Sequence, residues 1–261
     1  MQAVTQLLEE ALGAPLSGRR ILDVGAGQGL FHMAFFSREN DVTGIDLEVI
    51  AQGMDLRSYA HMWRANGPRR TIKTVGRKVL RIDRHYRREV ERQLGLRRFP
   101  RADVLQMDAT AMSFADESFE VVHSRSVLHH LPDPAQGVRE LARVLRPGGV
   151  AYISLHPYTS HTGSLDPRVM RGEGGLPLWP HLRPSTEGMV LQNAFLNKLR
   201  LTEWRTLFAE LMPGAHVHGL CSQDEARLRD AAARLQSEGE LTAYTLDELL
   251  TGNLVVVWRK E

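Results

Sequence analysis

A short apolar segment that runs directly into closely spaced glycines constrains this chain more than any other feature. Residues 20–24 have the composition of a buried strand, Gly25, Gly27 and Gly29 follow at once, and a helical pattern covers residues 30–37. Glycine permits a tight turn and lets a ligand approach the backbone closely. The segment therefore predicts a ligand-binding loop between a strand and a helix.

The spacing of these glycines differs from that of dinucleotide-binding loops. Such loops place their third glycine one position later, where this chain has Leu30. Asp23 stands just before the loop, and a carboxylate there favours a cationic ligand over a pyrophosphate. A second predicted strand, residues 41–46, ends on Asp46, at the position where a carboxylate can bind ribose hydroxyls.

Strands and helices alternate along most of the chain. Further strands are predicted over residues 102–107, 119–124, 150–155 and 254–258, and another is possible over 215–220. This alternation is typical of a parallel sheet with helices on both faces. We therefore expect a doubly wound α/β sheet, with chemistry at the carboxyl ends of its strands.

Two segments interrupt this alternation within the expected single domain, residues 1–261. The first, residues 52–99, carries apolar side chains at helical spacing from Ile72 to Leu94, which predicts a helical lid whose apolar face packs on the domain. The second, residues 156–190, is rich in Pro, Gly, Ser and His and predicts a loop-rich cap.

The first of these segments is strongly basic. Residues 64–101 contain fourteen Lys and Arg but three acids, a net charge of +11, although the whole chain has a net charge of only +2. This pattern suits an anionic partner, such as an anionic acceptor, and it equally suits a solvated helix face.

Composition excludes several classes of protein. Hydrophobic residues make up 43% and charged residues 25%, so a disordered, collagen-like or coiled-coil chain is not expected. No apolar run reaches the ~20 residues of a transmembrane helix. Cys221 is the single cysteine, so we expect no internal disulfide and a cytoplasmic location. No residues have convincing metal-ligand spacing, and no metal is expected.

Five segments together resemble the motifs of class I S-adenosylmethionine-dependent methyltransferases, in the small-molecule branch (type 11) that includes quinone-biosynthesis enzymes. They are residues 21–29 for the first motif, 42–46 for the second, 108–122 for the adenine-binding segment and fourth strand, 128–133, and 145–149. The resemblance covers roughly residues 18–155 apart from the insertion. It implies the strand order of that family, with an antiparallel last strand.

The resemblance also implies a cofactor and its ligands. S-adenosylmethionine would bind at the glycine loop and leave as S-adenosylhomocysteine, with Asp46 on the ribose and Asp108 on the adenine amino group. The implied cofactor-binding residues are Asp23, Gly25, Ala26, Gly27, Gly29, Asp46, Leu47, Asp108, Ala109 and Ser124.

Three histidines lie where an acceptor would bind. His129 and His130 follow the fourth predicted strand, and His156 ends the fifth. A neutral imidazole can remove a proton from a hydroxyl group, so these are the candidate catalytic residues. The same histidines can instead line the cofactor pocket or cap a loop.

We expect methyl transfer to a small-molecule acceptor, with O-methylation of a metabolite, natural product or sugar as the leading interpretation. Carbon and nitrogen acceptors stay open, because the fold does not fix the nucleophile. An RNA methyltransferase or RNA-binding protein is an alternative suggested by the basic segment. Few aromatic residues accompany that charge, however, which disfavours nucleic acid. A non-catalytic scaffold is a further alternative, and the oligomeric state is open.

Overall fold

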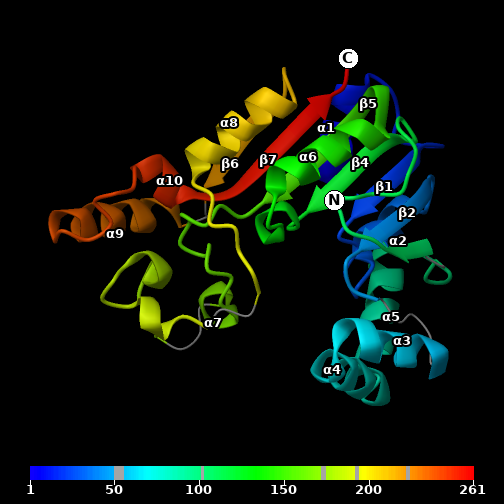
Figure 1. The fold of residues 1–261 in the computed structure, drawn as a ribbon, viewed down its shortest axis with the longest axis horizontal. Helices are drawn as coiled ribbons and strands as arrows, with labels where there is room; N and C mark the ends of the chain where they lie inside the picture. Colours follow the sequence, from blue (N-terminus) through cyan, green and yellow to red (C-terminus); the bar gives the residue numbers. More distant parts are fainter. Residues whose placement is uncertain (50–55, 101–102, 172–174, 192–193, 222–223) are drawn as a thin grey trace.

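A seven-stranded sheet with the order β3-β2-β1-β4-β5-β7-β6 forms the centre of the computed structural model (Figure 1). The structure describes residues 1–49, 56–100, 103–171, 175–191, 194–221 and 224–261. The strands are β1 (Arg20–Val24), β2 (Asp41–Asp46), β3 (Asp103–Gln106), β4 (Phe119–Arg125), β5 (Leu145–Leu155), β6 (His216–Cys221) and β7 (Thr251–Arg259). Strands β1 to β5 pair in parallel, and β7 is antiparallel to both of its neighbours, β5 and β6. The predicted doubly wound sheet with an antiparallel last strand is confirmed.

Helices cover both faces of the sheet because alternate strand residues point to opposite sides. Ile21 belongs to the core beneath α1 and α2, whereas its neighbour Leu22 belongs to the core beneath α6 and α8. The Asp133 carboxylate caps α6 by accepting the Gln136 backbone N–H at 2.9 Å. These helices are α1 (Gln2–Leu12), α2 (Phe31–Phe36), α6 (Pro134–Val144) and α8 (Leu201–Leu211).

The segment between β2 and β3 forms three helices, which lie below the sheet in Figure 1. They are α3 (Leu56–Asn66), α4 (Pro68–Val79) and α5 (Ile82–Leu94). The expectation that their apolar stripe packs on the domain is wrong for most of its length. Val90 is buried, but Ile72 is 62% exposed and Val79 is 68% exposed. Residues 52–55 of the predicted insertion lie outside the described residues.

The cap segment and the chain after β6 share a small core of their own, which we call the cap core. Its buried members are Trp179, Leu182, Leu228, Ala232, Leu235, Leu241, Leu249 and Leu250. They come from the loop-rich segment and from α9 (Glu225–Ser237) and α10 (Leu246–Leu250), beside the short α7 (Pro167–Met170). The buried indole of Trp179 donates a hydrogen bond to the Leu249 carbonyl at 3.3 Å, which joins the loop-rich segment to α10.

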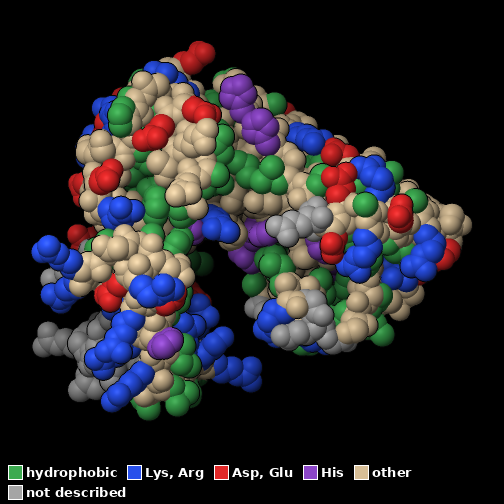
Figure 2. Space-filling model, turned by 180° about the vertical axis from the view of Figure 1, so that it is seen from behind, with side chains coloured by type: hydrophobic (Ala, Val, Ile, Leu, Met, Phe, Trp, Pro, Cys, Tyr) green, Lys and Arg blue, Asp and Glu red, His purple; other side chains and the backbone are tan. Residues whose placement is uncertain are grey.

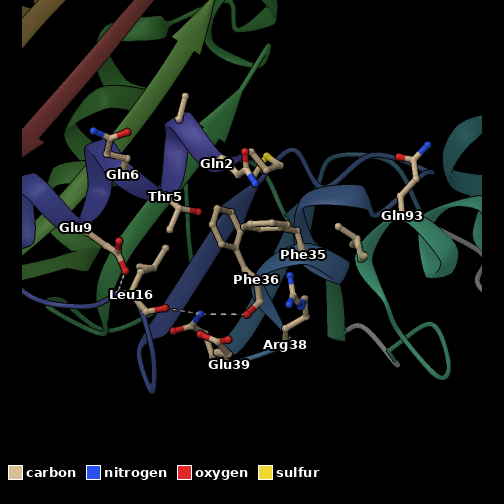
Figure 3. Close-up of a pocket in the computed structure, with 14 residues that line it drawn as sticks. Gln2, Thr5, Gln6, Glu9, Leu16, Phe35, Phe36, Arg38, Glu39 and Gln93 are labelled. Atoms are coloured by element: carbon tan, nitrogen blue, oxygen red, sulfur yellow. Dashed lines mark hydrogen bonds between the residues drawn. The ribbon is translucent and has the colours of Figure 1, made fainter.

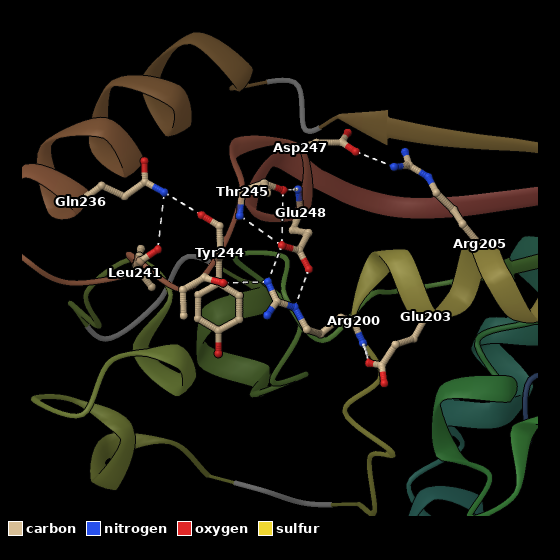
Figure 4. Close-up of polar contacts among 10 residues, drawn as sticks. Arg200, Glu203, Arg205, Gln236, Leu241, Tyr244, Thr245, Asp247 and Glu248 are labelled. Carbon is tan, nitrogen blue, oxygen red and sulfur yellow. Dashed lines mark hydrogen bonds and ion pairs between the residues drawn. The ribbon is translucent and has the colours of Figure 1, made fainter.

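An ion pair between an exposed arginine and a buried carboxylate holds α8 against this region (Figure 4). The Arg200 guanidinium donates two hydrogen bonds, of 2.6 and 2.7 Å, to the carboxylate of Glu248 and a third to the Ala243 carbonyl. Hydrogen bonding to Arg200 lowers the pKa of Glu248 below its usual value, although burial opposes that shift. The start of α8 is therefore held against α10 by a charge pair.

Strand β5 begins five residues earlier than the sequence predicts. The sequence pattern predicts that Pro147, Gly148 and Gly149 end the preceding helix ahead of a strand at 150–155, but they lie within β5. Backbone hydrogen bonds between Gly148, Gly149 and Lys260 tie this part to the end of β7. The tertiary pairing thus overrides the local turn signal. Ala102, the first residue of the expected third strand, lies outside the described residues.

No helix among the described ranges has the length and apolar character needed to cross a membrane.

Candidate functional site

The glycine loop leaves β1 at Val24 and is bonded to the end of β2. The backbone N–H groups of Gly25 and Ala26 both donate to the Ile45 carbonyl, at 2.8 and 3.0 Å. The Gly27 N–H donates to Asp46 Oδ2 at 2.9 Å. The loop and the acid that ends β2 therefore form one hydrogen-bonded unit.

Each glycine of the loop has a different physical reason to be there. Gly25 has a φ of +76°, and a Cβ at this residue would lie 2.1 Å from Val127 Cγ2. Gly27 has a φ of +63°, and the nearest atom to its added Cβ is a backbone oxygen at 3.9 Å. Gly25 is thus required by the protein's own packing, whereas Gly27 presents an open side to a ligand.

Tyr86 was not singled out as a site residue, but it lies against the glycine loop. A Cβ added to Gly29 would meet the Tyr86 hydroxyl at 3.0 Å. Tyr86 belongs to α5, so the basic insertion reaches the predicted cofactor site. The only sequence signal was its place in the apolar stripe.

The carboxylates of Asp46 and Asp108 lie at the same edge of the sheet, after neighbouring strands. Asp46 Oδ1 accepts the Glu48 N–H at 2.9 Å, and the Asp46 carbonyl accepts the Met107 N–H at 3.0 Å. Asp108 Oδ1 accepts the backbone N–H and the hydroxyl of Thr110, both at 2.8 Å. Beside these acids, Leu47 is exposed and Ala109 is buried. Both acids are held in place and keep oxygen lone pairs available for a ligand.

Asp23 lies behind the loop instead of facing it. Its buried carboxylate is 2.7 Å from Nδ1 of His123, the residue opposite it on β4. The ring of His32 lies 4.7 Å from that of His123, and burial lowers the pKa of His32 to about 4. Strand register brings these residues together, so the sequence alone did not reveal the cluster. Ser124 is likewise fully buried in β4. Neither Asp23 nor Ser124 has an exposed side chain, and their predicted roles as cofactor ligands stay predictions.

Asp23, His32 and His123 also form a group of possible metal donors, with atoms within 4.8 Å of one another. The guanidinium of Arg125 lies 3.3 Å from His32 Nε2. Its positive charge opposes a metal ion at this position. The group is better suited to joining β1, β4 and α2.

The structure brings the three predicted catalytic histidines together but gives them different environments. The ring of His129 lies 4.3 Å from that of His130 and 6.0 Å from that of His156. Burial, with the charges of the other two, lowers the pKa of His129 to about 3. Its Nδ1 accepts the His156 backbone N–H at 3.3 Å. His129 is therefore a neutral and weakly basic member of the cluster.

His130 and His156 each keep a nitrogen lone pair for chemistry. His130 Nδ1 donates to the Phe195 carbonyl at 2.8 Å, and His156 Nδ1 donates to the Gly252 carbonyl at 3.0 Å. Because Nδ1 carries the proton in both rings, Nε2 of each neutral ring is an acceptor. Burial lowers the pKa of His156 below its usual value. These two residues are the better candidates for a general base.

A cavity of about 240 Å³ is formed by the loop-rich segment and the residues just after it. Its lining includes Tyr158, which follows His156 by two residues, together with His181 and Lys198. The Lys198 ammonium lies over the Tyr158 ring, 5.4 Å from its centroid. The sequence pattern places His181 in a Pro-rich stretch that can pack over the site, but it gives no signal for Lys198, which lies far along the chain from the motifs.

A larger cavity of about 730 Å³ lies elsewhere, between α1, α2 and the end of α5 (Figure 3). Leu16 and Asn40 in its lining precede β1 and β2. The cavity is therefore at the amino ends of these strands, away from the glycine loop and the histidines.

Comparisons with known proteins agree with this architecture. The family described as "Methyltransferase domain" matches residues 68–153. The chain is 29% identical over 144 residues to a ubiquinone biosynthesis O-methyltransferase of Paracidovorax citrulli, covering 54% of this chain and 45% of that protein. It is 33% identical over 154 residues to the 27-O-demethylrifamycin SV methyltransferase of Amycolatopsis mediterranei, covering 57% and 43%. The chain thus spans less than half the length of either relative.

A solved structure is similar along almost the whole chain. The S-adenosylmethionine-dependent methyltransferase of Mesorhizobium loti superposes with a TM-score of 0.52 at 18% identity, covering 99% of this chain and 96% of that one. This structural similarity supports the fold. The sequence similarity to the two relatives covers little more than half of the chain. Together with the glycine loop bonded to the acid that ends β2, these similarities support a class I S-adenosylmethionine-dependent methyltransferase.

Proposed function

We propose that this chain transfers a methyl group to a hydroxyl oxygen of a small molecule. S-adenosylmethionine, when bound, supplies that methyl group. The observation that carries the proposal is the arrangement at one sheet edge. The loop-bound carboxylate of Asp46 ends β2, and His130 and His156, whose Nδ1 atoms donate to backbone carbonyls, follow β4 and β5. Two relatives with oxygen acceptors in their names support it.

The residues present fit the cofactor. Asp46 offers carboxylate oxygens for ribose hydroxyls, and the open side of Gly27 leaves room for a close ligand approach. Asp108, after the next strand along the sheet, offers an acceptor for an adenine amino group. The backbone hydrogen bonds on both acids orient them before any ligand arrives.

The acceptor site would lie beside His130 and His156. An acceptor hydroxyl would give its proton to Nε2 of one of these rings as its oxygen gains the methyl group. The cavity lined by Tyr158, two residues after His156, suits a small molecule better than a folded macromolecule. Its lining holds one basic and one acidic side chain, Lys198 and Glu187, so the cavity suits a polar acceptor without favouring either sign of charge.

Calorimetry with S-adenosylmethionine and S-adenosylhomocysteine tests the cofactor part. Asp46→Ala removes a charge-assisted hydrogen-bond acceptor, worth roughly 1.5–3 kcal/mol, so affinity should fall by about one to two decades. Gly27→Val should abolish binding, because its side chain would fill the open side of the loop. Asp41→Ala, at the exposed start of β2, is the matched control and should bind normally. Equal affinity in all variants, or tight NADH binding, would reject this site.

An assay for S-adenosylhomocysteine release, run with a panel of phenols, catechols and hydroxy acids, tests the transfer. We expect His130→Gln or His156→Gln to remove most of kcat, and His129→Gln to remove much less. If His156 is the base, its lowered pKa keeps it unprotonated below the pH at which free imidazole protonates, so the rate should persist there. Turnover of amines with no turnover of hydroxyl compounds would overturn the oxygen acceptor and leave the cofactor site intact.

A further inference from the structure

Helix α4 of the insertion buries its polar side and exposes its apolar side. Thr71 and Thr74 are 5% and 6% exposed, whereas Ile72 and Val79 on the neighbouring side are largely exposed. The two threonine hydroxyls donate to the carbonyls of Gly67 and Arg70, each at 3.0 Å, so the helix backbone satisfies them. A helix that faces only its own protein would have the opposite arrangement.

The exposed apolar surface continues past the end of α4. Leu80 is 72% exposed, Arg81 turns the chain with a φ of 58°, and Ile82 at the start of α5 is also exposed. We define the apolar corner as Ile72, Val75, Val79, Leu80 and Ile82. Clustered exposed aliphatic side chains mark interaction sites in soluble proteins, because leaving them in water is unfavourable.

Basic residues surround the apolar corner. Arg70 pairs with Glu48 and Arg77 pairs with Asp83. Within the part of the chain that the structure describes, no ion pair is formed by Arg69, Lys73, Arg81, Arg84 or Arg88, all exposed. Figure 2 shows Lys and Arg gathered over this lobe, with hydrophobic side chains between them.

We propose that the apolar corner and its surrounding basic residues dock on the surface of an anionic phospholipid bilayer. Such a surface places negative headgroups next to an apolar layer, and the insertion places free basic groups next to exposed aliphatics. Nucleic acid would complement the charge alone, because stacking on bases needs aromatic side chains and this lobe offers aliphatic ones.

The docked face belongs to the same insertion that reaches the cofactor loop. Tyr86 of α5 lies against Gly29, so docking would bring the glycine loop close to the membrane. The proposal rests on the surface of the insertion and is independent of the proposed transfer reaction.

Vesicle sedimentation without cofactor or acceptor tests the proposal. We expect the full chain to bind vesicles of phosphatidylcholine with phosphatidylglycerol, and to bind vesicles of phosphatidylcholine alone far less. Raising the salt concentration should weaken the binding, since exposed charges are screened over about 8–10 Å. Failure to bind the anionic vesicles overturns the proposal.

Two double variants separate the apolar and the electrostatic contributions. Val79→Ser with Leu80→Ser should weaken vesicle binding at least about tenfold, since buried aliphatic area is lost. Arg84→Gln with Arg88→Gln should weaken it about 25-fold, at about fivefold for each basic group near an anionic surface. The matched controls, Leu191→Ser with Leu220→Ser and Arg139→Gln with Arg234→Gln, change exposed residues elsewhere and should bind as wild type. Circular dichroism and S-adenosylhomocysteine binding check that each variant is folded.

Three results would overturn the proposal. One is vesicle binding that the variants and their controls reduce equally. Another is binding to an RNA oligonucleotide tighter than to vesicles, lost with Arg84 and Arg88 but unchanged by Val79→Ser with Leu80→Ser. The last is a dimer, seen by sedimentation velocity, that the aliphatic double variant abolishes, because the corner would then be a contact between two copies.

Discussion

The cap region and the insertion are both additions to the same sheet, but the cap region buries apolar side chains where helix α4 of the insertion buries polar ones. The cap core encloses an indole and several leucines, and its polar atoms have partners such as the Leu249 carbonyl. The insertion buries Met62 and Val90, but its helix α4 encloses threonines and leaves Ile72 and Val79 in water. The difference teaches that the cap region is organised around an apolar core of its own, whereas α4 has its polar side inward and its apolar side outward.

The largest test of this comparison uses two tryptophans. Trp179 is fully buried in the cap core, so Trp179→Ala should lower the free energy of unfolding by about 3–5 kcal/mol. Trp63 on α3 is 51% exposed, so Trp63→Ala should change it by no more than about 0.5 kcal/mol. Urea unfolding followed by circular dichroism measures both. Similar losses in the two variants would mean that the regions do not differ in this way.

The next largest effect concerns the ion pair of the cap region. Arg200→Met leaves the buried Glu248 carboxylate without its charge partner and should cost about 1.5–3 kcal/mol at neutral pH. Arg84→Met, at an exposed site of the insertion, is the control and should cost almost nothing.

The same pair predicts a pH dependence. The pKa of Glu248 is lowered in the folded state, mainly by hydrogen bonding to Arg200. Its stabilisation is therefore present above the pKa of an unfolded glutamate, ~4.3, and is lost as the pH falls through the lower folded pKa. Wild type and Arg200→Met should converge in stability below that range. A constant gap between them down to strongly acidic pH would contradict this account.

A smaller effect should come from a glycine inside α4. Gly76 has an ordinary helical backbone and no atom within 4 Å of an added Cβ, so Gly76→Ala should stabilise the helix by about 0.5–1 kcal/mol. Gly95 ends α5 with a φ of +64°, and Gly95→Ala should destabilise it because an L side chain is strained there. Hydrogen exchange of the α4 and α5 amides distinguishes the two. Equal protection changes of the same sign would refute the assigned conformations.

The smallest effect is expected from the inward side of α4. Thr74 is buried with its hydroxyl bonded to the Arg70 carbonyl, which already accepts within the helix. Thr74→Val should therefore change the unfolding free energy by no more than about 0.5 kcal/mol. A loss of several kcal/mol, measured by the same urea titration, would show that the threonine side is a specific polar interface.

The sequence predicted the sheet and the ligand edge because these depend on local signals. Gly27 was predicted from the glycines that follow a short apolar strand, and Asp46 from its position at the end of the next strand. Neither prediction needs knowledge of distant contacts, and the structure joins the two residues by a hydrogen bond. Alternation of strands and helices then fixes which edge of the sheet carries them. Cofactor binding by Gly27 and Asp46 stays a prediction, which the calorimetry tests.

Other features depended on information that a linear pattern does not contain. Helical spacing reveals that Ile72 and Val79 share a side of α4, but it does not say whether that side faces the protein or solvent. The three candidate histidines are close in the chain or in the sheet. Their capacity to act as a base differs because of burial and because of hydrogen bonds to carbonyls such as that of Phe195, neither of which the sequence shows. The partnership of Asp23 with His123 needs the register of β1 on β4.

Asn197 has a consequence for recombining this protein with its relatives. Its backbone N–H donates to the His129 carbonyl at 3.0 Å, and its side-chain amide donates to the carbonyls of Leu128 and Leu131. The turn that carries two of the histidines is thus bonded to a segment more than sixty residues later in the chain. A chimera that exchanges residues 195–199 without residues 128–131 would disrupt these bonds, so the two segments form one exchangeable module and should be inherited together.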